Sequence, residues 1–500
     1  MSNSNDEFLP ENEKNNKNRV STKKNTILNM IKTLSTIVFP LITFPYISRV
    51  LGVSNVGIYN FSNTFVSYFS LLASLGIYTY AVRECSLVKD NREKLNKIGS
   101  QLLSLNIITC VLSYVFLAIS LLFIRSLDNY RICIIIISSS LIFNTIGCEW
   151  INTAFEDFKY ITIRSVIIQL LALILMFVFI RKPEDYLIYA GIATISSCGS
   201  NLLNVFYRKK YCSLSFTFNL NLKRNLPPIL LLFALSLAQT IFSSSDITII
   251  GFIKGDYYVG LYSTAVKVFN IILQVLASIV WVLLPKLTQA FSKENYEIVN
   301  NLLDKALAFL IGLGLPCVAG IALLSEEVLY LIGGDLYLDA KWTLIILMFS
   351  CSINLVGSSF LGNLIILPSG KDKVFLLSCV IAAIINIALN LIFIPIYGIE
   401  AAATSTLVSY FIIFFILLIF IDKNIKIFAL YKKIIKPLIA TIIMLACGFF
   451  LKKVTDYIYI KLLITIFGCM IIYFIVLYIL KYNYLLEYSK KILLKIRGKK

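Results

Sequence analysis

The stretch IGSQLLSLNIITCVLSYVFLAISLLFI, residues 98–124, contains no charged residue and is long enough to cross a bilayer as a helix. About 20 helical residues, each rising 1.5 Å, span the ~30 Å hydrocarbon core. Lipid offers backbone amides no hydrogen-bond partner, so a crossing segment must satisfy them internally, as a helix does. This stretch therefore predicts a transmembrane helix.

Apolar runs of this kind, roughly fourteen in all, fill the sequence from Thr26 to Lys481. The 500 residues are 58% hydrophobic and 15% charged, unlike a soluble domain. We therefore predict an all-α polytopic membrane protein with about 14 transmembrane helices. The expected spans are residues 27–48, 58–82, 98–124, 132–150, 163–180, 187–206, 229–253, 262–284, 303–324, 343–366, 374–394, 400–420, 437–451 and 462–480.

The basic residues favour one side of these spans. Of the 46 Lys and Arg residues, 34 fall in the stretches that share a side with the N-terminus. The positive-inside rule then places both termini in the cytoplasm of a cell-membrane protein. Residues 1–25 are predicted as a disordered tail rather than a signal peptide, and residues 481–500 as a basic cytoplasmic tail. The net charge of +19 thus indicates membrane topology, and we expect no nucleic-acid partner.

An internal repeat divides the chain. The sequence GVSNVGIY at residues 52–59 recurs as GDYYVGLY at residues 255–262, 203 positions later. Duplication of this kind predicts two pseudo-symmetric six-helix bundles with a substrate cleft between them. The expected six-helix bundles are residues 26–210 and 229–420, joined by a cytoplasmic linker at 211–228. Two additional helices follow at 421–480.

Polar residues recur at helical spacing in the first two spans of each half. Lys32 and Thr36 share one face of the first span, and Ser70 and Ser74 share one face of the second. In the other half the polar faces carry Asp246 in span seven and, in span eight, Lys267, Asn270 and Gln274. These faces predict a polar lining for the cleft, because a charged residue at membrane depth needs water or a partner.

Each of these residues also has an ordinary structural explanation. Serine and threonine stripes are common at contacts between membrane helices. Lys32 lies near the cytoplasmic face and could extend its ammonium to the interface, while Lys267 and Asp246 could simply pair with each other. Arg49 and Arg83 lie at span ends, and Glu149 and Arg164 flank the loop after span four. At all four an interfacial anchor is as plausible as a substrate contact.

Several classes of chemistry lack their residues in this sequence. There is no histidine, so a histidine metal site or a histidine-dependent catalytic triad is excluded. The eleven cysteines form no C-x-x-C pair and are expected to be small apolar filler. No G-x-x-x-x-G-K-[ST] loop is present. We therefore expect no enzyme activity, catalytic residue, metal or cofactor.

Four stretches resemble a known family: FPYISRVLG at 44–52, VGIY at 56–59, the segment from Gly76 to Glu84, and EW at 149–150 with FEDFKY at 155–160. They are similar to the polysaccharide repeat-unit flippases, the Wzx-type exporters of O-antigen, capsule and exopolysaccharide. These belong to the polysaccharide transporter branch of the MOP/MATE-like superfamily. One departure is that Thr153-Ala154-Phe155 precede Glu156, where the family has Gln-Gly before that glutamate.

The resemblance implies a flippase that moves undecaprenyl-diphosphate-linked oligosaccharide repeat units from the inner to the outer leaflet. It would work by alternating access through a central cationic cavity, and it would serve lipopolysaccharide or other surface polysaccharide biosynthesis. Its partners would be membrane lipids and, in the cell, a polysaccharide polymerase with chain-length machinery. The expected substrate-binding residues are Lys32, Arg49, Arg83, Lys267, Asn270 and Gln274, and the expected ion-coupling residues are Asp246 and Glu149.

Three alternatives fit the same spans. A lipid II-type flippase has closely related chemistry. A MATE-like cation or drug antiporter would share the fold, but its cavity would be expected to carry more acidic than basic residues. A membrane polymerase or acyltransferase generally needs a large loop, whereas the longest external loop expected here is residues 325–342.

Overall fold

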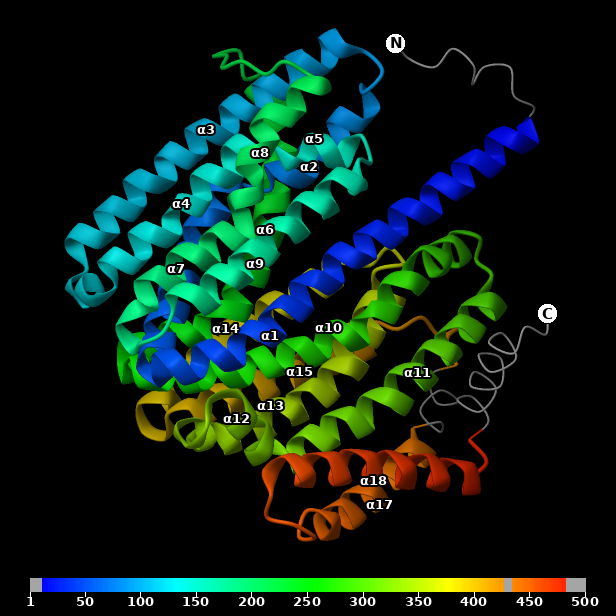
Figure 1. Ribbon diagram of the computed structural model, residues 1–500. Helices are drawn as coiled ribbons and strands as arrows, with labels where there is room; N and C mark the ends of the chain where they lie inside the picture. The colour runs from blue at the N-terminus through cyan, green and yellow to red at the C-terminus, as the bar shows by residue number, and fades with distance from the viewer. Residues whose placement is uncertain (1–10, 427–433, 483–500) are drawn as a thin grey trace. The chain divides into compact units, whose positions relative to one another are not determined.

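The computed structural model describes residues 11–426 and 434–482, which form helices joined by short connections and contain no strand (Figure 1). The all-α prediction is confirmed. The chain divides into two compact units, residues 1–237 (unit 1) and residues 238–500 (unit 2). The division falls inside helix α9 (Leu222–Lys254), after the segment 211–228 that the sequence predicts as a linker.

In unit 1, helix α4 (Arg131–Gly147) packs against α1 (Glu11–Ser74), α3 (Arg92–Phe123), α7 (Tyr186–Thr194) and α8 (Ser200–Tyr207). A buried apolar cluster joins α2 (Ile77–Leu87) and α5 (Glu149–Ala154) to α3 through side chains such as Tyr80, Trp150 and Leu102. The other elements of unit 1 are η1 (Arg125–Tyr130), α6 (Phe158–Phe179), η2 (Pro183–Asp185), η3 (Ile195–Gly199) and η4 (Arg208–Lys210).

In unit 2, the helices α10 (Asp256–Ser292), α11 (Tyr296–Leu323) and α13 (Lys341–Asn354) pack against one another. Helix α15 (Ile399–Ile419) contacts α13 and α14 (Asp372–Tyr397). Helix α17 (Ile435–Leu451) packs on α11 and pairs with α18 (Ile458–Ile479). Shorter elements are α12 (Ser325–Gly333), η5 (Asp335–Ala340) and η6 (Leu355–Ile366).

Within the described residues, 11 helices are long and apolar enough to cross a membrane. Three features account for the difference from the fourteen expected spans. The first two spans form one continuous segment, Val38–Leu87, in which two helices meet at Gly52. The sixth is divided into α7, η3 and α8, and the thirteenth is α17, which has only 17 residues. The chain is thus a multi-pass membrane protein, and the count of fourteen stays a prediction.

The N-terminal segment differs from the disordered tail that its composition predicts. Helix α1 begins at Glu11, so residues 11–25 are helical, while residues 1–10 lie outside the described part of the chain. No Gly or Pro occurs between residues 11 and 39, so a helix that begins in the first span has no sequence signal to stop it. The expected C-terminal tail lies outside the described residues from 483 onward.

The backbone shows the repeat at the same positions as the sequence. Gly52 has φ 75° and ψ 172°, and Gly255, 203 residues later, has φ 86° and ψ −175°. Only glycine adopts this region of backbone conformation without strain. Each glycine connects two long helices, in α1 and between α9 and α10. The two halves therefore join their first and second spans in the same way.

We expect Gly52→Ala and Gly255→Ala each to lower the free energy of unfolding by about 1–3 kcal/mol, the cost of forcing a side chain into this conformation. Nothing lies within 4 Å of the Cβ that either substitution would add, so no steric clash would add to the backbone strain. Gly320→Ala in α11, where the space is also open and φ is ordinary, is the matched control. Thermal denaturation in detergent measures all three, and equal melting temperatures would contradict the prediction.

Candidate functional site

Unit 1 contains a cavity of about 350 Å³ whose lining residues are mostly polar. Among the described lining residues, Ala73 and Leu141 are aliphatic. The polar and aromatic lining residues are Lys32, Thr36, Ser70, Ser74, Tyr78, Asn106, Asn144, Thr145, Glu149, Trp150, Ser165, Gln169, Ser196, Ser197, Ser200 and Asn201. Such a lining inside a membrane bundle is costly unless water or a polar ligand occupies it.

A sharp break between α4 and α5 positions Glu149 at this cavity. Cys148 adopts a left-handed conformation, with φ 48° and ψ 46°, so α4 ends at Gly147 and α5 starts at Glu149. Two side chains satisfy carbonyl groups exposed by that break: Asn204 donates to Gly147 O at 2.7 Å, and Arg208 donates to Ile146 O at 2.6 Å.

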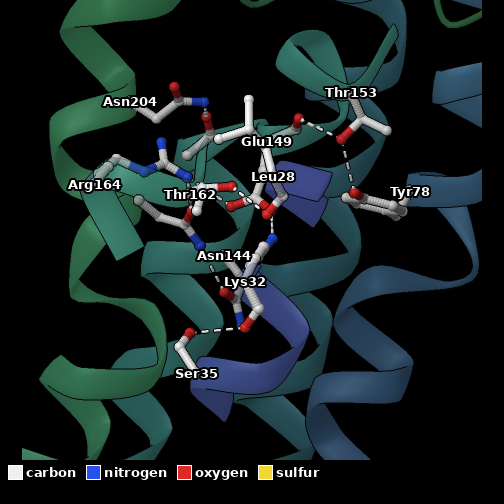
Figure 2. Close-up of polar contacts among 12 residues, drawn as sticks. Leu28, Lys32, Ser35, Tyr78, Asn144, Glu149, Thr153, Thr162, Arg164 and Asn204 are labelled. Carbon is white, nitrogen blue, oxygen red and sulfur yellow. Dashed lines mark hydrogen bonds and ion pairs between the residues drawn. The ribbon is translucent and has the colours of Figure 1, made fainter. Parts of the chain in front are cut away.

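Glu149 lies between two cations, as Figure 2 shows. Lys32 Nζ of α1 lies 2.8 Å from Glu149 Oε1, and Arg164 Nη2 of α6 lies 2.6 Å from Glu149 Oε2. The exposed fractions of the Lys32, Glu149 and Arg164 side chains are 29%, 19% and 1%. Two cations thus face one carboxylate, and the cluster carries a net positive charge beside the cavity.

Several buried polar atoms around the cavity have no hydrogen-bond partner among the described residues. In the lining these are Asn106 Oδ1, Trp150 Nε1 and Gln169 Oε1. Behind Glu149, the Nε and Nη1 atoms of Arg164 are also unpaired. Most buried polar groups in proteins are hydrogen-bonded. The cavity therefore has both donors and acceptors that a polar ligand could use.

Asparagines of α4 and α8 continue the polar contacts of the cluster along the cavity lining. Asn201 Nδ2 donates to Asn144 Oδ1 at 2.9 Å, and Arg164 Nη2 approaches Asn201 Oδ1 at 3.5 Å. Arg164 also lies over the Tyr160 ring, with its Cζ 5.3 Å from the ring centroid. These contacts fix the guanidinium in place.

The structure brings two of the expected site residues, Lys32 and Glu149, together at the cavity. Arg83 lies on α2, where its side chain is 65% exposed, contacts Glu84 at 3.3 Å and does not line the cavity. Arg49 is exposed near the end of the first helix of α1. The sequence pattern presented Arg164 only as a span-end residue, and it did not single out Asn144 or Asn201.

The expected site residues of unit 2 lie on α9 and α10. Lys267 is half-buried on α10, and Asn270 and Gln274 are exposed on the same helix. Asp246 of α9 is only 6% exposed. Its carboxylate accepts hydrogen bonds from Tyr262 Oη at 2.5 Å, Asn390 Nδ2 at 2.5 Å and Thr406 Oγ1 at 2.9 Å. Among the described residues its hydrogen-bond partners are thus all neutral.

Unit 2 also contains an apolar cavity of about 350 Å³ where α10, α11 and α12 meet α17 and α18. Among its described lining residues, Thr465 and Tyr473 carry hydroxyl groups, and Tyr473 donates its hydroxyl proton to Gly312 O at 2.6 Å. Across the described parts of both units, no group of three or more acidic or cysteine side chains is arranged to hold a metal ion.

Comparisons with known proteins agree on one kind of relative. Residues 22–291 match the family model described as polysaccharide biosynthesis protein. A protein of Escherichia coli (strain K12) that carries the name O-antigen transporter is 25% identical over 55% of this chain and 66% of its own length. The capsular polysaccharide biosynthesis protein CapF of Staphylococcus aureus is 27% identical over 72% of this chain and 88% of its own length.

A solved structure shows the same fold. The lipid II flippase MurJ, in an inward closed conformation, matches 91% of this chain and 99% of its own length with a TM-score of 0.75 and 18% sequence identity. At that identity the likeness concerns the fold alone. The helical transporter fold expected from the sequence is therefore confirmed.

Proposed function

The chain belongs to the polysaccharide biosynthesis protein family, and from this membership we propose that it is a flippase for surface polysaccharide precursors. The proposed substrate is an oligosaccharide repeat unit linked to undecaprenyl diphosphate, moved from the inner to the outer leaflet of the cytoplasmic membrane. We further propose that both termini are cytoplasmic, as the distribution of basic residues predicts.

The observation that carries this proposal is the polar cavity of unit 1 with Lys32 in its lining. A diphosphate that leaves water needs cationic partners, because burying an unpaired charge is costly. Lys32 supplies a cation at the cavity, and the serine, threonine and asparagine side chains supply hydrogen bonds for sugar hydroxyls. We propose Lys267, Arg49, Arg83, Asn270 and Gln274 as further headgroup contacts during the transport cycle.

The lipid part of the substrate needs a different environment. The apolar cavity of unit 2, lined by side chains such as Leu313, Ile466 and Phe474, suits a hydrocarbon chain. The isoprenoid tail itself can stay in the surrounding lipid while the headgroup crosses. The molecule thus offers separate polar and apolar compartments for an amphipathic substrate.

For ion coupling we propose Asp246 rather than Glu149. The Asp246 carboxylate is buried among neutral donors, so a proton or a Na⁺ ion would compensate its charge. Glu149 is already neutralised by Lys32 and Arg164. We propose no enzyme activity, and in the cell we expect the polymerase and chain-length machinery to act after this protein.

A lipid II-type flippase remains the second candidate, because a lipid diphosphate would meet the same cavity. A MATE-like antiporter for cationic drugs fits less well, since the cluster at the unit 1 cavity carries two cations and one carboxylate. A cationic drug would be repelled by that net positive charge.

Deletion of the gene tests the proposal. We expect surface polysaccharide to be lost and one lipid-linked oligosaccharide to accumulate on the inner leaflet of the cytoplasmic membrane. Mass spectrometry of extracted lipids identifies the accumulated species, and accumulation of lipid II instead would establish the second candidate. Normal polysaccharide together with a new drug sensitivity would contradict the flippase assignment.

A further inference from the structure

We propose that the Glu149 carboxylate switches between two positions. In the first it pairs with Lys32 as well as Arg164, and when an anionic headgroup binds Lys32 it pairs with Arg164 alone. The proposal rests on the proposed function for the class of ligand, a phosphate-bearing headgroup. It assigns roles to three residues: Lys32 binds the anion, Glu149 competes with it, and Arg164 receives Glu149.

The present arrangement shows the first position. Each oxygen of Glu149 contacts a different cation, Lys32 through Oε1 at 2.8 Å and Arg164 through Oε2 at 2.6 Å (Figure 2). A phosphate that approached Lys32 in this arrangement would meet a carboxylate at hydrogen-bonding distance from the same ammonium. Like charges this close repel strongly in a medium of low dielectric constant. The anion can therefore bind Lys32 well only if Glu149 withdraws.

The second position is prepared on Arg164. Its Nη2 already contacts Glu149, while its neighbouring Nε and Nη1 atoms are buried and have no hydrogen-bond partner in the described part of the chain. A guanidinium binds a carboxylate best through two parallel hydrogen bonds, and either unpaired nitrogen can complete such a pair with Nη2. A carboxylate released by Lys32 would thus satisfy a donor that is unsatisfied in the first position.

The surroundings favour movement of Glu149 rather than of Arg164. The Arg164 side chain is 1% exposed and lies against Tyr160 and Asn201. Glu149 follows the break at Cys148 and begins the six-residue helix α5. Lys32 comes from a different helix, α1, and its side chain is the most exposed of the three. Binding of the anion to Lys32 and the ion pair between Lys32 of α1 and Glu149 of α5 therefore exclude each other. The ion pair is formed when the cavity is empty and broken when the ligand is bound.

Titration of the full-length protein in lipid nanodiscs with farnesyl diphosphate tests the switch. Tryptophan fluorescence is the signal, to which Trp150 in the cavity lining contributes beside Trp281 and Trp342. We expect Glu149→Gln to lower the Kd about tenfold, because the competing charge is gone while one hydrogen bond to Arg164 remains. Glu156→Gln, which removes the same charge from an exposed site seven residues away, should leave the Kd unchanged. Adding Lys32→Gln to Glu149→Gln should abolish this decrease in Kd.

Arg164→Lys separates the switch from simple charge removal. Lysine keeps the charge but cannot donate two parallel hydrogen bonds to the carboxylate. Glu149 should therefore remain paired with Lys32, and the Kd for farnesyl diphosphate should rise about threefold or more. Adding Glu149→Gln to Arg164→Lys should restore tight binding. Acetylation of the Lys32 amine, quantified by mass spectrometry without any ligand, should increase several-fold in Glu149→Gln.

The proposal is overturned if Glu149→Gln binds farnesyl diphosphate no more tightly than wild type, or if neither protein binds it. It is also overturned if Glu156→Gln lowers the Kd as much as Glu149→Gln does. Unchanged acetylation of Lys32 would overturn it as well, and that measurement stands even if a variant is too unstable to titrate. Failure of the switch can be distinguished from failure of the proposed function. The proposed function is tested by the lipids that accumulate in the deletion strain and not by binding of farnesyl diphosphate.

Discussion

Lys32→Ala is expected to abolish surface polysaccharide in a deletion strain that carries the variant gene, without loss of membrane insertion. The substitution leaves Glu149 and Arg164 as a neutral pair and so removes the excess positive charge beside the cavity. A hydrogen bond between charged groups contributes about 1.5–3 kcal/mol, so the headgroup should bind roughly 10- to 100-fold more weakly. Immunoblots of surface polysaccharide and of membrane fractions measure the two quantities.

Lys267→Ala is expected to have the same phenotype, since a half-buried lysine on α10 in a membrane helix is costly unless it serves a polar partner or substrate. Two controls accompany the pair. Lys32→Arg keeps the charge and should retain part of the export, and Lys293→Ala, at an exposed position just after α10, should export normally. Normal export by Lys32→Ala and Lys267→Ala would remove these lysines from the mechanism.

The membrane fold could be predicted because its determinants are local. Each span depends on a run of apolar residues, and the repeat at Gly52 and Gly255 is visible as sequence before it is visible as backbone geometry. Boundaries were harder, because hydropathy does not record where a helix breaks. The π-helical segment η3, for example, interrupts the sixth span without any Gly or Pro at its start.

The site was predicted only in part, for a physical reason. Spacing along one helix identifies a polar face, so Lys32 and Thr36 could be placed on a polar lining. Contacts between helices far apart in the sequence leave no such pattern. Glu149 is 117 residues from Lys32, and its pairing with Lys32 and Arg164 depends on the break at Cys148. A span-end glutamate and arginine are indistinguishable from interfacial anchors until the helices are packed.

The expected proximity of the two charged residues in unit 2 illustrates the same limit. Asp246 and Lys267 have compatible positions along their helices, which is why an ion pair between them was one interpretation of the sequence. In the structure the carboxylate is instead enclosed by Tyr262, Asn390 and Thr406. Asn390 follows Asp246 by 144 residues, and no single-helix pattern connects them.

Asp246→Asn is expected to reduce any dependence of the protein on Na⁺ or protons, and to abolish export. The buried carboxylate has neutral hydrogen-bond partners, and Asn390 Oδ1 beside it has no partner within the described residues. A cation there would gain the carboxylate and neighbouring oxygen atoms as ligands. Asparagine preserves the shape of the side chain and removes its charge, so the cation would lose its main partner.

Melting temperatures of the purified protein measure the binding of an ion at Asp246. A bound ion stabilises the folded state by about 2.7 kcal/mol when its concentration is 100 times its Kd. The wild-type melting temperature should therefore rise with NaCl relative to choline chloride if Na⁺ is the ion, or change with pH if it is a proton. Asp246→Asn should show a clearly smaller response than wild type, whereas Asp372→Asn, at the exposed start of α14, should respond like wild type. An Asp246→Asn response equal to that of wild type would place the coupling ion elsewhere.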